Sequence, residues 1–194
     1  MIIPTVVEEA MTDPMNTSTV EQALRRLGEL LEYHTEIELL LVGGAAGMIT
    51  GLFDRGHVTF DCDVMDYAPK EAMGAVEQAA ELVANELGLA PDWLNSHVQL
   101  RTDALPNGWR TRQVLVGVFG KLRISAASRP DLIAMKVLAG RDQDIGDLQE
   151  LRVREDDVEF VRRYLDTLAF KGTTQEQISD AYELLDALEL YDEE

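Results

Sequence analysis

A single stretch in the first third of the chain constrains the fold most strongly. It reads LLLVGGAAGMITGLFDRGHVTFDCDVMD and covers residues 39–66. The apolar run at residues 37–42 predicts a strand, and the glycine pair at positions 43 and 44 ends it. A helix is expected over residues 45–53, and alternating apolar and polar residues predict a second strand over residues 58–64. The stretch therefore predicts a strand, a glycine turn, a helix and a strand in direct succession.

The polar residues of the second strand are expected to point to one side of the sheet. Thr59, Asp61 and Asp63 stand two positions apart, so their side chains share a face. Two neighbouring carboxylates repel each other, and a shared divalent cation relieves that repulsion. The pattern predicts Asp61 and Asp63 as metal ligands, with the polar outer face of an ordinary strand as the alternative. The other face is expected to be core, and its residues are Val58, Phe60, Cys62 and Val64.

The glycine pair before the helix indicates a place for phosphate. A Gly-Gly turn lets backbone N–H groups approach an anion at the positive end of a helix dipole. Gly43 and Gly44 are therefore candidate nucleotide-binding residues, and a tight turn without a ligand is the alternative. A phosphate cradle beside metal-holding carboxylates is the minimum equipment for phosphoryl or nucleotidyl transfer.

The order of these motifs resembles the nucleotidyltransferase fold of the polymerase-β-like superfamily. Two further stretches narrow the resemblance, namely Asp92-Trp93-Leu94-Asn95 and the run from position 129 to 148, which reads RPDLIAMKVLAGRDQDIGDL. With them the chain is similar to a group of small bacterial nucleotidyltransferases. That group resembles the toxin halves of abortive-infection toxin–antitoxin pairs. The likeness covers roughly residues 20–150.

The resemblance implies roles for three residues of the second stretch. Lys136 and Asp147 would belong to the active site, with Asp147 as a candidate base, and Asp144 would contribute to the nucleotide site. The residues by themselves allow other interpretations. The Lys136 stem could carry its ammonium group to the surface. Asp144 and Asp147 lie one turn apart, and they could simply stabilise a helix N-terminus.

Arg55 resembles an arginine that precedes the Thr-x-Asp-x-Asp motif in relatives, where it would help to bind the nucleotide with Thr59. In this chain Arg55 stands two positions further from Thr59 than the Arg-x-Thr pattern requires. His57 occupies the gap and is expected to be a surface residue. Trp93, Leu94 and Asn95 are expected to pack a helical turn against the sheet rather than to touch a substrate.

The chain departs from the family pattern in one respect. Many nucleotidyltransferases place a third carboxylate on a neighbouring strand, close enough to hold a second metal ion. The hairpin expected over residues 113–124 contains no Asp or Glu. Either the reaction proceeds with the two aspartates and help from Lys136 and Asp147, or the chain is catalytically weakened.

Composition limits the partners of such a protein. With 17 Lys and Arg against 36 Asp and Glu, the formal charge is −19, which argues against a broad grip on DNA or RNA. It permits an NTP whose charge Mg²⁺ or Mn²⁺ meets locally, and it permits a basic protein partner. The single cysteine, Cys62, is expected to be a buried thiol in a reducing compartment. With no signal peptide and no run of about 20 apolar residues, a cytoplasmic, non-membrane protein is expected.

The fold class expected is α+β, with a small mixed sheet covered by helices and an all-helical C-terminal part. We divide the chain into a nucleotidyltransferase-fold core with an N-terminal helix, residues 1–127, and a helical part packed on it, residues 128–194. A Ser18-x-x-Glu21 capping box would open the first helix. Further helices are expected at 70–88, 128–139, 145–152, 155–170 and 173–190.

These observations predict a metal-dependent nucleotidyltransferase that moves a nucleotide from an NTP to a hydroxyl acceptor. Asp61 and Asp63 would hold Mg²⁺ against the triphosphate. A tRNA, a protein hydroxyl and a small molecule are all open as acceptors, with the acidic composition favouring the last two. The resemblance implies a toxin-like component of a toxin–antitoxin pair. The alternative is a weakened binding module of the same fold that pairs with a basic protein.

Overall fold

A mixed β-sheet forms the centre of the protein. The structure, a computed structural model, describes residues 13–54, 56–96, 105–168 and 173–189. The sheet has five strands in the order β3-β2-β1-β5-β4, and β1 pairs antiparallel with β2 and parallel with β5. The strands are β1 (Ile37–Val42), β2 (Cys62–Ala68), β3 (Leu94–Asn95), β4 (Val114–Phe119) and β5 (Leu122–Ala126).

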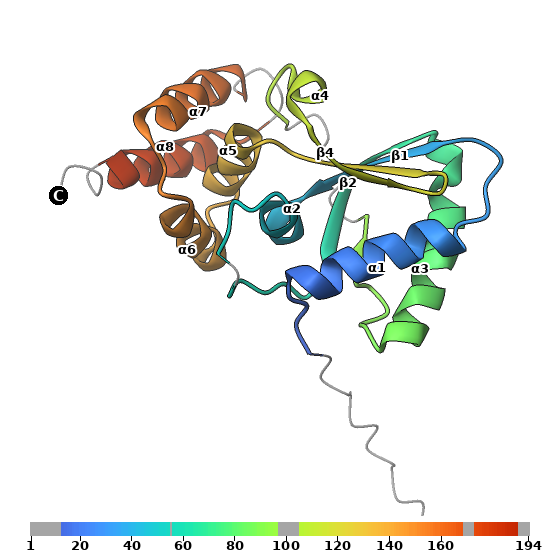
Figure 1. Cartoon of the computed structure of the whole chain (residues 1–194). Helices are drawn as coiled ribbons and strands as arrows, with labels where there is room; N and C mark the ends of the chain where they lie inside the picture. The colour runs from blue at the N-terminus through green and yellow to red at the C-terminus, as the bar shows by residue number, and fades with distance from the viewer. Residues whose placement is uncertain (1–12, 55, 97–104, 169–172, 190–194) are drawn as a thin grey trace, which may run out of the picture.

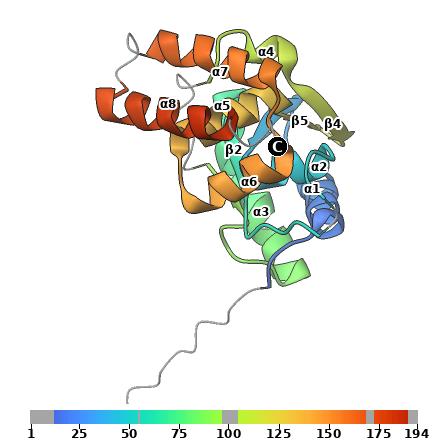
Figure 2. The same ribbon diagram turned by 90° about the vertical axis from the view of Figure 1, so that its left-hand side faces the viewer.

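Helices cover one face of the sheet and one of its ends. Helices α1 and α3 pack together below the sheet, whereas α5, α6, α7 and α8 gather at one end (Figures 1 and 2). This arrangement confirms the α+β class with a small mixed sheet. No helix in the described part of the chain is long and apolar enough to cross a membrane. The helices are α1 (Thr17–Leu30), α2 (Gly43–Ile49), η1 (Lys70–Ala72), α3 (Met73–Leu87), α4 (Trp109–Arg112), α5 (Arg129–Ala139), α6 (Asp142–Leu151), α7 (Glu155–Leu168) and α8 (Gln175–Glu189).

The first helix begins earlier than its sequence signal indicated. The side chain of Asn16 accepts a hydrogen bond from the backbone N–H of Thr19 at 3.0 Å, so Asn16 is the N-cap. The predicted Ser18–Glu21 capping box is therefore wrong, because an Asn two positions upstream already satisfies a free N–H group. The apolar side of the helix buries Val20, Ala23, Leu24 and Leu27.

The segment before β2 also differs from the prediction. Cys62 and Val64 are fully buried, but the side chains of Val58 and Phe60 are 45% and 67% exposed. The prediction that Val58 and Phe60 belong to the core is therefore wrong. The strand begins at Cys62, and the preceding segment pairs through one isolated bridge between Thr59 and Met15. Burial of alternate residues requires a packed sheet face, and this segment precedes it.

The residues Leu94 and Asn95 form an edge strand instead of the expected helical turn. This strand, β3, runs parallel to β2 and pairs Leu94 with Cys62 and Asn95 with Asp63. The adjacent Trp93 is completely buried, and its indole N–H donates to the carbonyl oxygen of Ala80 in α3 at 2.9 Å. The bond to α3 and the edge pairing hold this segment extended beside β2.

Buried ion pairs connect the C-terminal helices to each other and to α4. Arg112 donates to Asp131 at 2.6 and 3.2 Å, and Asp131 is almost completely buried at the start of α5. Arg129 donates to Asp157 at 2.7 Å and to backbone carbonyls at the end of α6. Breaking a buried pair leaves an uncompensated charge, so these contacts fix the helices in one arrangement.

The accessibility of Cys62 tests the description of β2. Burial raises the pKa of the Cys62 thiol, and the charges of Asp61 and Asp63 raise it further. We expect Cys62 in the folded protein to react with an aromatic disulfide reagent far more slowly than in the denatured protein, since the thiolate is the reactive species. A Cys62→Ser, Phe60→Cys variant should react at once when folded. Equal protection of both positions would contradict the placement of the strand start.

Candidate active site

The pairing of β1 with β2 brings the start of α2 against an aspartate. Val42 lies opposite Asp63, and the chain turns at the next residue, Gly43, with a positive φ of 69°. A Cβ atom added to Gly43 would lie 2.8 Å from Oδ2 of Asp63. Both the backbone angle and the space therefore require glycine. The first residue of α2 and the Asp63 carboxylate are thus in direct contact.

Asp61 lies beside Asp63 on the same face of the sheet. Asn95 on β3 is opposite Asp63 and donates its Nδ2 hydrogen to Oδ2 of Asp61 at 2.8 Å. Burial raises the pKa of Asp61, and the negative charge of Asp63 raises it further, while the bond from Asn95 acts in the opposite direction. Two carboxylates that oppose each other's ionisation are the groups of this site that could hold a divalent cation.

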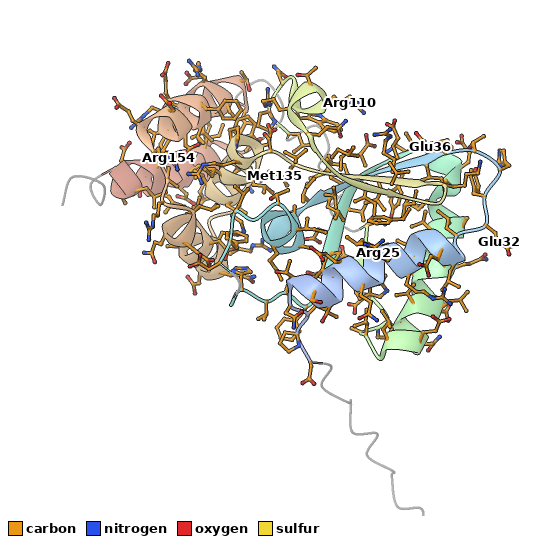
Figure 3. All side chains as sticks on the ribbon, in the orientation of Figure 1. Arg25, Glu32, Glu36, Arg110, Met135 and Arg154 are labelled. Atoms are coloured by element: carbon orange, nitrogen blue, oxygen red, sulfur yellow. The ribbon has the colours of Figure 1, made fainter. Side chains whose placement is uncertain are left out.

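The face that carries these aspartates is hollowed further along β2. Leu40 lies opposite both Asp66 and Ser125, and an irregularity in the β1–β2 register puts Asp66 on the same face as Asp63. Figure 3 shows Glu36 and Arg110 on this side, away from α1 and α3. The hollow has a volume of about 570 Å³, and its lining includes Glu38, Leu40, Asp66, Trp109, Arg110 and Arg123.

Lys136 is buried between two carboxylates of α6. Its side chain is 7% exposed, and its ammonium group donates to Oδ1 of Asp144 at 3.2 Å and to Oδ2 of Asp147. The interpretation that the lysine head reaches the surface is therefore wrong. Burial disfavours the ionised form of Asp144, but the bond from Arg141 and the charge of Lys136 outweigh this effect and lower its pKa.

Arg141 connects this cluster electrostatically with the aspartates of β2. Its Nε donates to Oδ2 of Asp144 at 2.7 Å, although the side chain is largely exposed. That bond raises the pKa of Arg141, and the charges of Asp63 and Asp147 add to the effect. In turn, the positive charge of Arg141 offsets a small part of the rise that burial and Asp63 cause in the pKa of Asp61. Arg141 thus bonds to Asp144 and contributes a positive charge near the other carboxylates.

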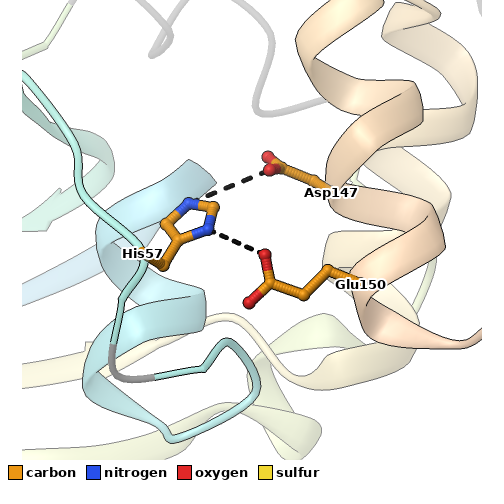
Figure 4. Close-up of side chains that lie close together, drawn as sticks. All are labelled: His57, Asp147 and Glu150. Carbon is orange, nitrogen blue, oxygen red and sulfur yellow. Dashed lines mark hydrogen bonds and ion pairs between the residues drawn. The ribbon is translucent and has the colours of Figure 1, made fainter.

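His57 contacts the other side of the same cluster (Figure 4). Its Nδ1 lies 3.0 Å from Oε2 of Glu150, and its Nε2 lies 3.8 Å from Oδ1 of Asp147. The ring stacks on Phe53 with centroids 4.2 Å apart. Since its side chain is 12% exposed, the expectation of a surface residue is wrong.

Gly44 lies next to the side chains of His57 and Thr59. A Cβ atom added to Gly44 would lie 3.3 Å from Oγ1 of Thr59 and 3.9 Å from Nε2 of His57. The Thr59 hydroxyl donates to the backbone carbonyl of Asp61 at 3.0 Å, which fixes the segment that leads into β2. In the glycine turn, Gly43 therefore lies against Asp63, and Gly44 lies against Thr59 and His57.

The side chains of His57, Asp147 and Glu150 could also be considered as a metal site. Their ligand atoms lie within 4.8 Å of one another. Each carboxylate, however, already has a donor, because Lys136 bonds to Asp147 and the backbone N–H of Asp54 bonds to Glu150 at 2.6 Å. Burial opposes the ionisation of Glu150, but the bonds from Asp54 and His57 outweigh it and lower its pKa.

The structure brings together most of the residues that the sequence singled out. The turn and β2 contribute one group, and α5 and α6 contribute the other. Arg55 lies outside the described residues. Strands β4 and β5 contain no Asp or Glu, so the additional carboxylates near the site come from α6. The predicted residues that meet here are Gly43, Gly44, Thr59, Asp61, Asp63, Lys136, Asp144 and Asp147.

Four further residues belong to this constellation and had no predicted role in it. They are His57, Asn95, Arg141 and Glu150. His57 and Glu150 are 93 positions apart, so no local pattern could relate them. Arg141 and Asn95 lie in the two stretches that carried the family resemblance. Their place in these stretches was the one sequence feature that could have indicated a role in the site.

The buried Lys136 gives a stability prediction. Lys136→Met should lower the free energy of unfolding by about 3–5 kcal/mol, because Asp147 would keep a buried charge without its cation. Adding Asp147→Asn should recover part of the loss, since the unpaired charge is then removed. Urea denaturation measures both, with Lys70→Met as the control, since that lysine is exposed and its pair with Asp66 should contribute less than about 1 kcal/mol. A Lys136→Met protein as stable as wild type would contradict the buried pair.

Comparison with known families finds one match for this chain. Residues 18–188 match a family described as nucleotidyltransferase of unknown function (DUF6036), and this range includes every residue of the site. No curated protein and no solved structure matches the chain. Because the match spans most of the chain, the resemblance to the nucleotidyltransferase superfamily is confirmed: the protein belongs to this family of nucleotidyltransferases.

Proposed function

We propose that the protein is a metal-dependent nucleotidyltransferase that transfers a nucleotide from an NTP to an acceptor hydroxyl at Asp61 and Asp63. The family supports nucleotidyl transfer in general. The observation that carries the specific proposal is the contact between Gly43 and Asp63, with Asp61 alongside. It joins a glycine turn, where phosphate can approach the backbone, to a pair of carboxylates suited to a cation.

The carboxylate pair fits a divalent metal ion. The raised pKa of Asp61 reports both its burial and its repulsion from Asp63, and a bound cation would offset this repulsion. Asp61 and Asp63 would be the ligands, with Mg²⁺ preferred because both ligands are hard oxygen donors, and Mn²⁺ as the alternative. When bound, the metal would neutralise charge on the triphosphate and on the leaving pyrophosphate.

The protein groups around the pair have separate proposed tasks. The N–H groups at Gly43 and Gly44 would bind phosphate oxygens, with Thr59 beside them. Lys136 and Arg141 would add positive charge on the α5–α6 side, where the geometry already directs them at carboxylates. Asp144 would hold these two cations in place.

The base role that the resemblance implies falls on Asp147. Its carboxylate lies between Lys136 and His57. Accepting the proton of the attacking hydroxyl, directly or through the neighbouring His57, would complete the set of functions that the reaction needs.

The hollow on the open face is the proposed place for the acceptor. It begins at Asp66, on the same strand and face as Asp63. Its charged lining combines carboxylates with guanidinium groups, and Arg110 and Arg123 are already paired with Asp66 and Glu36. Such a surface offers few free cations to an RNA backbone, so a small molecule or a protein hydroxyl is favoured over tRNA.

A second candidate function is a catalytically weakened binding module. Two observations favour it: the absence of an acidic residue from β4 and β5, and the formal charge of −19, which suits a basic protein partner. A toxin-like member of a toxin–antitoxin pair could have this form or the active one. A measurement of nucleotide binding at Asp61 and Asp63 distinguishes the active enzyme from the weakened binding module.

Replacing both aspartates tests the proposal. Wild-type protein should show a rise in melting temperature with Mg²⁺ and an NTP, because a ligand that binds the native state stabilises it. Asp61→Asn with Asp63→Asn should abolish that rise. Without ligand the variant should be slightly more stable than wild type at pH 7. The raised pKa of Asp61 means that the fold disfavours its charge, so this gain should vanish at acidic pH, where wild type is also protonated.

The matched control is Asp156→Asn with Asp180→Asn, which removes the same charge from exposed helix positions. It should keep the full nucleotide-dependent rise. A double Asp61–Asp63 variant that still responds to Mg²⁺ and NTP would contradict the proposed site.

A further inference from the structure

His57 has a more specific arrangement than a packing residue needs. Its ring is fixed on one side by Phe53, and both of its nitrogens face carboxylates on α6. Glu150, in turn, is fixed by the N–H of Asp54. A histidine that an oriented carboxylate holds at one nitrogen is the usual arrangement of a side chain that moves protons.

The contacts define which nitrogen can take a proton. An ionised carboxylate can only accept a hydrogen bond, so the Nδ1 of His57 is assigned as the donor to Glu150 across 3.0 Å. In a neutral imidazole the other nitrogen, Nε2, then carries the lone pair. This atom lies beside Gly44, the residue next to the glycine that contacts Asp63. Nε2 therefore has two neighbours, Oδ1 of Asp147 at 3.8 Å and the glycine turn that borders the proposed reaction centre.

Asp147 itself is poorly placed to meet a substrate. Its Oδ2 is bonded to Lys136, and its Oδ1 faces Nε2 of His57 at 3.8 Å. The side chain is only 7% exposed. Both oxygens of Asp147 therefore have protein neighbours, whereas Nε2 of His57 also adjoins the glycine turn.

We infer that His57 is the catalytic proton acceptor of the proposed reaction, that Glu150 is its positioning residue and that Asp147 acts through it. The inference rests on the proposed nucleotidyl transfer. The proton of the acceptor hydroxyl passes to Nε2 while the acceptor oxygen bonds to the α-phosphorus. The bond between that phosphorus and the bridging oxygen breaks, and pyrophosphate leaves with the electron pair. The imidazolium that results lies between Glu150 and Asp147.

The charged groups around His57 favour this assignment. Helix α6 presents Glu150 and Asp147, whose negative charges stabilise an imidazolium. Helix α5 presents Lys136, whose charge is already balanced by Asp144 and Asp147. The loop before β2 presents the uncharged hydroxyl of Thr59.

The first experiment measures transfer from α-labelled Mg·NTP to water, as release of the labelled monophosphate, and to the soluble components of a cell extract. His57→Gln should lower the turnover at least 100-fold, the lower end of the contribution of a general base, and leave NTP affinity by calorimetry within about twofold. His34→Gln is the control, because His34 is exposed and its ring lies tilted against that of Tyr33, outside the residues of the proposed site. Turnover of His57→Gln within threefold of wild type would overturn the inference.

Glu150→Gln tests the positioning role. The amide can still accept the Nδ1 hydrogen, but it lacks the charge that favours the imidazolium, so the acidic limb of the pH–rate profile should move to lower pH. His57→Gln should remove this limb. An unmoved limb in Glu150→Gln would overturn the role of Glu150.

Nitrogen NMR supplies a readout that does not depend on activity. At pH 8 the His57 signals, identified by their loss in His57→Gln, should show hydrogen on Nδ1 and none on Nε2. The opposite tautomer would overturn the inference.

Tight binding of Zn²⁺ that His57→Gln abolishes and Asp61→Asn preserves would also overturn the inference, because the cluster would then be a metal site. A wild type that neither binds Mg·NTP nor turns it over would refute the proposed function itself, whereas normal binding and turnover in His57→Gln would refute this inference alone.

Discussion

The antiparallel pairing of Val42 with Asp63 is the contact on which the rest of the site depends. It ends β1 at the position where the chain must turn into α2, and the positive φ of Gly43 allows that turn beside a carboxylate. A register shift by one residue would turn Asp63 to the helix-covered face and Cys62 to the open one. The complete burial of Cys62 and Val64 therefore stabilises the register that exposes the aspartates.

The second half of the site depends on a different kind of interaction. Lys136 of α5 joins the two helices because its ammonium group bonds to Asp144 and Asp147 of α6. Burying these charges costs free energy, and the cost is offset only while every charge keeps its partner. Arg141 bonds to Asp144 of this cluster, and His57 lies between Asp147 and the glycine turn. In this cluster each side chain orients its neighbour through a hydrogen bond or an ion pair. Residues far apart in the sequence therefore keep one arrangement.

The sequence predicted those features that depend on local order. The apolar run and the glycine pair indicated β1 and the turn after it correctly, whereas the alternation over residues 58–64 predicted a strand that begins only at Cys62. The exposure of Phe60 could not be predicted, because burial depends on whether another element packs on that position. The contact between His57 and Glu150 could not be predicted either, since it joins distant segments after α6 has packed. The periodicity of a sequence indicates neither which element packs on a position nor which distant segments come into contact.

The most direct test of the central claim follows the fate of the phosphates. Wild-type protein is incubated with Mg²⁺, a fractionated cell extract and each NTP carrying label on either the α- or the γ-phosphate. Nucleotidyl transfer at Asp61 and Asp63 predicts that the α-label becomes attached to an acceptor while the γ-label is released in pyrophosphate. Transfer of the γ-label to an acceptor, or α-label transfer that persists when both aspartates are replaced by asparagine, would contradict the account.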